Sequence, residues 1–252
     1  MENGSLNPQH AFILNPDGGQ NGDSQENCGT HECREISGML PRDVACRISR
    51  ANPGGTEGAE IPRPETTKVQ RQVIAAAGFL PLITFPSRFD AKGTEHVVRF
   101  RGLSVEKHQH SDGWVPVLDE AGMLGIERAL PSEYLRRLEL QNELFGDRIR
   151  VMGLTRANRF AISQPSLRGG EPGENEIRDL LVEGGWQRVP IQVQNLPHQL
   201  MGSAWWHDAE ELVLVDARKP NFKLTDFGVL PIDLILADLT PDMRARFSHP
   251  AS

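Results

Sequence analysis

The distribution of apolar residues divides the chain into two unequal parts. Residues 1–66 hold stretches rich in Gly, Asn, Pro and Glu, such as NPDGGQNGDSQENCG, and no apolar periodicity longer than a few residues. Such a segment buries too little apolar surface to offset the conformational entropy lost on folding. We therefore expect residues 1–66 to be disordered, with the short runs HAFIL and ISGMLP able to dock on the body or on a partner. Residues 67–252 have the length of one globular domain.

Helical periodicity is clearest in PSEYLRRLELQNELFGD. The predicted helix starts at Pro131 or Ser132, carries Glu133 in its first turn and stops at Gly146. Its apolar residues recur at helical spacing and form one stripe. A second helix, TTKVQRQVIAAAG, begins at threonines and closes near Gly78, and a third, ENEIRDLLVEGG, ends at paired glycines.

Other apolar runs alternate or are β-branched, which is typical of strands. EHVVRFRGLSVEKHQH predicts two strands joined at Arg101–Gly102, and RIRVMGLT with RFAISQP predicts two more around Ala157–Asn158. ELVLVD, NFKLT and VLPIDLIL are strand-like runs near the C-terminus. The order of strand pair, helix, strand pair, helix and strands predicts a mixed α+β fold.

The charge balance narrows the choice of partners. The net charge is −7, with 34 acidic and 27 basic residues, which argues against a broad nucleic-acid or anionic-membrane surface but leaves a local basic patch possible. No apolar run is long enough to span a bilayer, and the N-terminus lacks the apolar core of a signal peptide. We expect a cytosolic protein with no membrane partner.

All three cysteines lie in the N-terminal segment. Cys28, Cys33 and Cys46, with His31 in the sequence CGTHEC, supply the ligand types of a zinc site. Their spacing is not that of the usual zinc motifs. Reduced thiols without a metal are therefore the expected state.

The segment VDARKPNFKLTDFGVLPIDLIL contains D-F-G, the tripeptide that carries the magnesium-binding aspartate of protein kinases. Phosphoryl transfer needs a carboxylate near the attacking hydroxyl, a second carboxylate and an amide for magnesium, and a lysine for the phosphates. Asp216 and Asn221, with four residues between them, fit the first loop of such a site. Asp, Pro and Asn also favour ordinary turns, so a purely structural role stays open for these two residues.

Two aspartates compete for the metal-binding position. Only five positions separate Asn221 from Asp226, which is too few for a hairpin because strands take about five residues each. Twelve positions separate Asn221 from Asp233, enough for FKLT, a turn at DFG and a return strand VLPI. The spacing predicts that Asp226 lies at a hairpin tip and that Asp233 is the metal ligand. A carboxylate within VLPIDLILA also needs a partner, because an unpaired buried charge is costly.

PSEYLRRLELQNELFGDRIRV, ISQP and VDARKPNF leading to VLPIDLIL together resemble the polyvalent protein kinase family of phages and mobile elements, and more distantly the aminoglycoside phosphotransferases. The resemblance covers about residues 67–240. It implies a compact protein-kinase-like fold, with a β-rich N-lobe carrying one main helix over residues 67–165 and a reduced C-lobe over 166–252. It also implies ATP and Mg²⁺ as cofactors, with a protein or small molecule as phosphate acceptor.

The resemblance further implies a lysine that anchors the nucleotide and a helix glutamate paired with it. Lys107 in LSVEKHQ occupies the lysine position, although an exposed strand lysine is a common alternative. Glu133 fits the partner by motif, and Glu139 is its rival. Glu133 has the simpler alternative of complementing the helix dipole.

The remaining roles follow from the same resemblance. Ser163 and Gln164 fall where the chain would contact adenine. Asp216 would position the acceptor hydroxyl and accept its proton, while Asn221 and Asp233 would hold magnesium.

Two departures from the kinase pattern keep other functions open. There is no G-x-G-x-x-G loop, the nearest glycine being Gly93, and the chain ends at Ser252, too soon after Asp233 for an activation segment and a large helical lobe. A nucleotide-binding pseudokinase or interaction module is the alternative to an active phosphotransferase. A structural or DNA-associated protein of a phage or mobile element is a third, to which the acidic balance gives no support.

Overall fold

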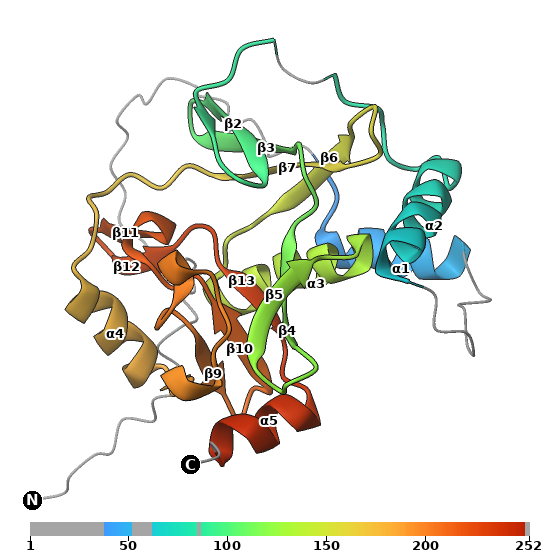
Figure 1. Ribbon diagram of the computed structural model, residues 1–252. Coiled ribbons are helices and arrows are strands. Elements are labelled where there is room, and N and C mark those ends of the chain that lie inside the picture. The colour runs from blue at the N-terminus through green and yellow to red at the C-terminus, as the bar shows by residue number, and fades with distance from the viewer. Residues whose placement is uncertain (1–37, 52–61, 85–86, 250–252) are drawn as a thin grey trace, which may run out of the picture.

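The computed structural model describes residues 38–51, 62–84 and 87–249. These residues form a mixed α+β fold with several antiparallel sheets (Figure 1). No helix in this part of the chain is long and apolar enough to cross a bilayer. The helices are α1 (Pro41–Ala51), α2 (Arg63–Ala76), α3 (Pro131–Phe145), α4 (Glu174–Glu183) and α5 (Pro241–Ser248).

The larger sheet has the strand order β1-β2-β3-β7-β6, and all its neighbouring strands are antiparallel. Its strands are β1 (Ala91–Lys92), β2 (His96–Arg101), β3 (Ser104–Gln109), β6 (Arg150–Leu154) and β7 (Phe160–Pro165). α3 lies between β3 and β6 in the sequence. Leu135 and Leu138 of α3 join Val151, Phe160 and Ile162 of the sheet in one buried cluster. The main helix therefore packs on this sheet.

A four-stranded sheet, ordered β13-β10-β9-β8, forms the second part of the fold. Its strands are β8 (Gln187–Arg188), β9 (Trp205–His207), β10 (Leu212–Val215) and β13 (Ile235–Asp238). β10 is buried along its whole length. Because successive strand residues point to opposite faces, Leu212 and Leu214 join the cluster that includes α4, while Val213 and Val215 join the one that includes α5.

Two hairpins and three short 3₁₀ segments complete the described structure. The hairpins are β4 (Trp114–Leu118) with β5 (Leu124–Arg128), and β11 (Phe222–Thr225) with β12 (Gly228–Pro231). The 3₁₀ segments are η2 (Ile191–Val193), η3 (His198–Leu200) and η4 (Lys219–Asn221). β11 and β12 lie beside α4 in Figure 1, and β13 passes beneath α3 into the four-stranded sheet.

Part of the segment expected to be disordered is folded. α1 lies inside residues 1–66 and buries Val44 completely, and α2 begins at Arg63. Met39, in the run ISGMLP, exchanges two backbone hydrogen bonds of 2.8 and 2.7 Å with Val151 at the edge of the larger sheet. An isolated 11-residue helix is only marginally stable in water, so tertiary packing must stabilise α1. For the same reason, the local sequence alone does not predict this helix. The run HAFIL lies outside the described residues.

Most of the predicted elements are confirmed. The helices α2, α3 and α4 and the strand pairs β2–β3 and β6–β7 occur where the patterns place them, and Gly146 ends α3 with a φ of 66°. The run VLPIDLIL, expected as one strand, forms the end of β12 and the start of β13. The sequence patterns do not predict the β4–β5 hairpin or α5. Pro116 within WVPVL weakens a strand pattern, because proline cannot donate to a ladder.

Candidate functional site

Lys107 and Asp233 are distant in the sequence but meet in the structure. Lys107 lies on β3, the central strand of the larger sheet, and is 8% exposed. Its Nζ donates a hydrogen bond of 3.0 Å to the carbonyl of Ile232 and lies 3.8 Å from Oδ2 of Asp233. Gln164, on the adjacent strand β7, donates to the same carbonyl at 3.4 Å. The break between β12 and β13 is thus held against the larger sheet.

Asp233 reaches this position through the β11–β12 hairpin. Asp226 and Phe227 form the exposed turn of that hairpin, with Phe227 80% exposed. The amide of Ile232 donates a 2.8 Å hydrogen bond to the carbonyl of Asn221, which closes the base of the hairpin. Asn221 therefore lies beside the residue that precedes Asp233. The prediction that D-F-G forms a hairpin tip between Asn221 and Asp233 is confirmed.

The guanidinium of Arg137, on α3, joins the parts of the site. Arg137 is 3% exposed and contacts both carboxylate oxygens of Glu95 at 2.9 Å. It also donates to Oδ1 of Asp233 at 2.8 Å and to the carbonyl of Leu234 at 2.6 Å. One buried side chain thereby ties the helix to the turn before β2 and to the turn before β13. Charge-assisted contacts of this geometry are stronger than neutral hydrogen bonds.

The two carboxylates of this cluster respond differently to their surroundings. Burial opposes ionisation of Asp233, but Lys107 and Arg137 outweigh it and lower its pKa from 3.8 to about 2. Burial raises the pKa of Glu95, and Arg137 offsets part of that increase. The side chain of Asp233 is 36% exposed, whereas that of Glu95 is 7% exposed. Asp233 is therefore an ionised carboxylate whose Oδ1 accepts from Arg137 and whose Oδ2 lies near Lys107.

Two further titratable groups border the cluster. Burial lowers the pKa of His96 to about 3, so its imidazole is neutral and shares a 2.8 Å hydrogen bond with the hydroxyl of Tyr134. Burial also raises the pKa of Asp147 to about 7, against the opposing effect of Lys107. Gln141 of α3 donates to Asp147 at 3.4 Å. Asp147 is consequently a carboxylate near Lys107 that titrates around neutral pH.

The loop after β10 brings Asp216 and Asn221 together. Asp216 has a φ of 69°, a left-handed conformation that aspartate tolerates better than most residues. Its side chain is 19% exposed and pairs with Arg218. The amide nitrogen of Asn221 donates a 2.9 Å hydrogen bond to the carbonyl of Asp216. Asn221 thus connects the loop that carries Asp216 with the base of the hairpin that precedes Asp233, through hydrogen bonds to Asp216 and Ile232.

The expected pairing of Glu133 with Lys107 is absent from the described structure. Glu133 instead accepts a 2.6 Å hydrogen bond from Arg63 and one of 2.7 Å from the backbone amide at the start of α3. Its rival Glu139 pairs with Arg136 at 3.0 Å. A glutamate in the first turn is well placed to cap its own helix, and this local bond together with Arg63 fixes Glu133 there.

Ser163 and Gln164 do not act as a pair. Consecutive residues of a strand point to opposite faces, and Gln164 lies on the face that carries Lys107. Ser163 is 4% exposed on the other face, and its hydroxyl has no hydrogen-bond partner among the described residues. Only Gln164 of the two therefore adjoins the cluster.

The residues present fit a magnesium ion that arrives with phosphates. No group of three His, Cys, Asp or Glu side chains suited to a metal occurs in the part of the chain that the structure describes. Asp233 offers Oδ2, and the amide oxygen of Asn221 makes no hydrogen bond to another described residue. Mg²⁺ is commonly held by one or two protein oxygens together with water and substrate phosphates. This donor set suits such an ion better than a metal caged by protein alone.

Of the predicted cysteine cluster, the structure describes only Cys46. Cys46 is exposed on α1. Cys28, His31 and Cys33 lie outside the described residues, so the expectation of reduced thiols stays a prediction.

Glu95, Arg137 and Asp147 belong to the cluster around Asp233 but were not predicted from the sequence. Arg137 follows Tyr134 by three positions on the buried stripe of α3, and a charge within an apolar stripe is a detectable signal. Glu95 stands at the start of β2 and Asp147 just beyond the end of α3. Neither has a local pattern that separates it from a surface carboxylate.

Comparison of the chain with protein-family models, with curated proteins and with solved structures finds no significant match. The functional interpretation therefore depends on the geometry of the site and on the sequence patterns.

Replacing Arg137 should destabilise the protein far more than replacing its neighbour Arg136. Arg137→Met leaves Glu95 without its buried counter-charge and leaves Asp233 with Lys107 alone. Removing one partner of a buried ion pair costs roughly 3–5 kcal/mol of unfolding free energy. Arg136→Met removes ion pairs from a side chain that is 39% exposed, which costs about 0–1 kcal/mol. Urea unfolding of both variants measures the difference. Equal losses would contradict the central role of Arg137, and Glu95→Gln should partly rescue Arg137→Met.

Asp147→Asn should change the pH dependence of stability. Between pH 3.8 and about 7, Asp147 keeps its proton in the folded protein but loses it in the unfolded chain. The unfolding free energy of the wild type therefore falls as pH rises through this window, and above it the penalty is complete. The asparagine amide cannot ionise, so the variant should gain stability relative to wild type at pH 8 and less at pH 4. Thermal melting across this range tests it, with the exposed Asp226→Asn as control; parallel curves for all three proteins would refute it.

Proposed function

We propose that the protein is a Mg-ATP-dependent phosphotransferase of compact kinase-like architecture. The observation that carries the proposal is the meeting of Lys107 with Asp233, at 3.8 Å, across a large separation in sequence. A lysine for the phosphates beside a carboxylate for magnesium is the pairing that phosphoryl transfer requires. The spacing of Asp216, Asn221 and Asp233 leads to the same metal-binding aspartate independently of the geometry.

The arrangement of elements supports the same proposal. In protein kinases the anchoring lysine lies on the third strand, and a helix packed near it takes part in positioning the site. Lys107 lies on the third strand of the order β1-β2-β3-β7-β6, and α3 follows before the last two strands of that sheet. The four-stranded sheet and the β11–β12 hairpin then stand where a reduced C-lobe would supply the catalytic and metal-binding residues.

Each residue has a role in this proposal. Asp233 and Asn221 would hold the Mg²⁺ that accompanies ATP, which would supply positive charge to the phosphates. Lys107 binds phosphate oxygens. Asp216 orients the acceptor hydroxyl and accepts its proton. Gln164 borders the nucleotide, whereas Ser163 and Glu133 contribute only through the structure of β7 and α3.

A cavity of about 490 Å³ adjoins the proposed catalytic loop and supports an acceptor site there. It is lined by Ala217, Arg218 and Lys219, the residues directly after Asp216, and by Trp205 of β9. An acceptor in this cavity would lie beside the loop that carries Asp216. Both protein and small-molecule acceptors remain within the proposal.

A nucleotide-binding module without catalysis is the second candidate, and two contacts favour it. Arg137 engages one oxygen of Asp233, and Arg218 engages the carboxylate of Asp216. A base paired with an arginine must be released before it can accept a proton. The family resemblance would make either version a protein of a phage or mobile element, and the cytosol is its proposed location.

Magnesium-dependent ATP binding tests the proposed site directly. Calorimetry should show that Asp233→Asn weakens binding of Mg-ATP at least about tenfold, because the metal loses its charged ligand. Binding of ATP without magnesium should change little. Asp226→Asn, at the exposed hairpin tip, is the matched control and should bind like wild type. Loss of binding in both variants, or no binding by folded wild type, would overturn the proposal.

Turnover separates the enzyme from the binding module. Asp216→Asn should lower ATP hydrolysis, with water as acceptor, by about 10²–10⁴-fold, because it removes the general base. Its affinity for Mg-ATP should stay near that of wild type. Release of ADP by the two purified proteins measures this. Equal residual activity in wild type and variant would favour the non-catalytic candidate.

A further inference from the structure

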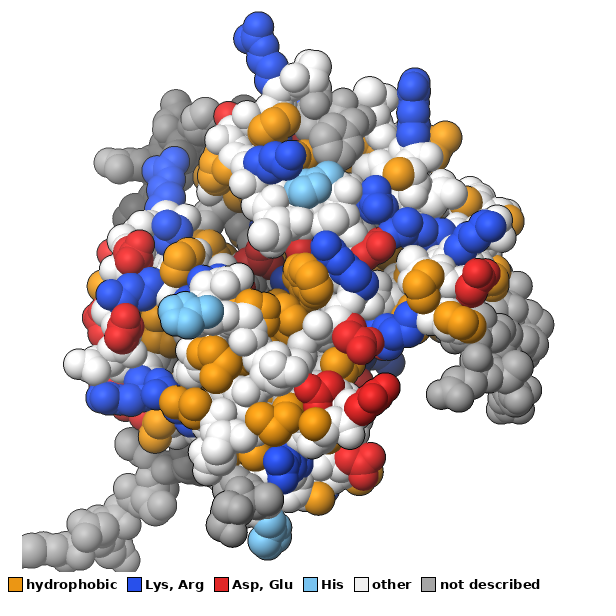
Figure 2. All heavy atoms as spheres, in the orientation of Figure 1, with side chains coloured by type: hydrophobic (Ala, Val, Ile, Leu, Met, Phe, Trp, Pro, Cys, Tyr) orange, Lys and Arg blue, Asp and Glu red, His pale blue; other side chains and the backbone are white. Residues whose placement is uncertain are grey.

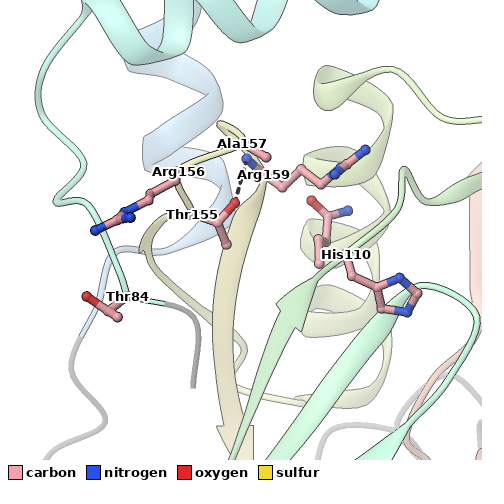
Figure 3. A pocket seen from close by; sticks show the side chains of 7 residues that line it. Thr84, His110, Thr155, Arg156, Ala157 and Arg159 are labelled. Atoms are coloured by element: carbon pink, nitrogen blue, oxygen red, sulfur yellow. Dashed lines mark hydrogen bonds between the residues drawn. The ribbon is translucent and has the colours of Figure 1, made fainter. Parts of the chain in front are cut away.

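A second region rich in charge lies around the turn between β6 and β7. One cavity, of about 430 Å³, is lined by Thr84, His110 and Arg156, among others (Figure 3). A second, of about 630 Å³, runs along α2. Arg156 and Arg159 project from the turn in opposite directions (Figure 3).

Lysine and arginine outnumber aspartate and glutamate in the lining of these two cavities. We call this region the basic groove, and define it by its six cationic residues Arg63, Lys68, Arg71, Arg128, Arg156 and Arg159. Two carboxylates, Asp112 and Glu127, line it as well. The lining residues therefore carry a net charge of +4, six cations less two carboxylates, on a chain whose net charge is −7. Glu133, which is not part of the lining, offsets the charge of Arg63. Figure 2 shows lysine and arginine side chains gathered on the part of this face that α2 occupies in Figure 1.

The ion pairs within the groove leave an excess of guanidinium groups. Arg71 and Arg159, one from each cavity, share the carboxylate of Asp112; Arg71 is in close contact with it and Nε of Arg159 lies 3.8 Å away. Burial lowers the pKa of Arg71, and the like charge of Arg159 lowers it further. One carboxylate cannot neutralise two arginines. An additional anion between them would relieve their repulsion.

We propose that the basic groove binds an acidic polypeptide segment, with carboxylates that reach Arg71 and Arg159 and the exposed Lys68 and Arg156. Five of the six cations are arginines, whose planar fork matches a carboxylate in two-point contact. Asp112 of the second cavity lies 3.8 Å from Arg159 of the first, and Asn158 of the second lies between Ala157 and Arg159 of the first along the chain. Two neighbouring cavities suit an extended ligand with several charges. The groove shares no residue with the Lys107–Asp233 site, so this binding is independent of the proposed phosphotransferase.

The lining favours a peptide over a nucleic acid. Among the described residues that line the two cavities there is no Phe, Tyr or Trp on which a base could stack. The nearby ring of Trp114 is covered by Arg128 at 3.9 Å. Thr67, Gln72 and Asn158 supply polar groups suited to peptide amides.

Binding of a fluorescein-labelled decaglutamate peptide to the full chain, followed by anisotropy at low ionic strength, tests the proposal. Lys68→Gln with Arg156→Gln should weaken binding about tenfold, because two exposed cations are removed. Arg168→Gln with Arg178→Gln makes the same change in net charge away from the groove and should leave affinity within about twofold. Both pairs are exposed, so folding should persist, and thermal melting checks it.

A second set of variants tests Asp112, because its carboxylate competes with those of the peptide for Arg71 and Arg159. Asp112→Asn should tighten peptide binding, since Arg71 and Arg159 then lack their internal anion, while Asp179→Asn on α4 should not. Three results would each overturn the proposal: failure of wild type to bind the peptide, equal weakening by the two double variants, or tighter binding of a single-stranded oligonucleotide than of the peptide.

Discussion

The buried guanidinium of Arg137 is the constraint on which the rest of this structure depends. It connects the main helix with the turn before β2 through Glu95, and with the turn before β13 through Asp233 and Leu234. These turns belong to different sheets. A buried charge of this kind requires complete satisfaction, because a missing partner leaves the others uncompensated in a poorly solvated place. The relative position of the two sheets is therefore specified by hydrogen-bond geometry as well as by apolar packing.

Much of the local structure could be predicted because each element satisfies its own periodicity. The alternation in SVEKHQ places Lys107 on one face of β3, and β10 divides its apolar residues between two cores. Counting residues between Asn221 and Asp233 is enough to place the D-F-G tripeptide in a turn, because a hairpin has a minimum length. The nearness of Lys107 and Asp233 also follows from this reasoning once the kinase-like layout is assumed.

The partners of the site residues could not be predicted in the same way. Whether Glu133 or Arg137 faces the site depends on the rotation of α3, which is set by its packing against both sheets. Glu133 is diverted by Arg63, a residue of a helix whose start falls in the segment expected to be disordered. α1 is similar, since its stability comes from contacts with α3 and the edge of the sheet. Contacts between side chains that are distant in the sequence are therefore hard to predict from the pattern of any one segment.

The charges around Asp233 nearly cancel, and this has a consequence for the order in which ligands bind. Two carboxylates, Glu95 and Asp233, stand against two cations, Lys107 and Arg137, while His96 is neutral and Asp147, with a pKa of about 7, is only partly ionised at neutral pH. A bare divalent cation therefore meets almost no net attraction and also faces two fixed positive groups. A nucleotide that already carries its magnesium keeps a net negative charge and meets those same groups favourably. Under the proposed function, the metal is delivered by the nucleotide, and the protein selects the complex over the free ion.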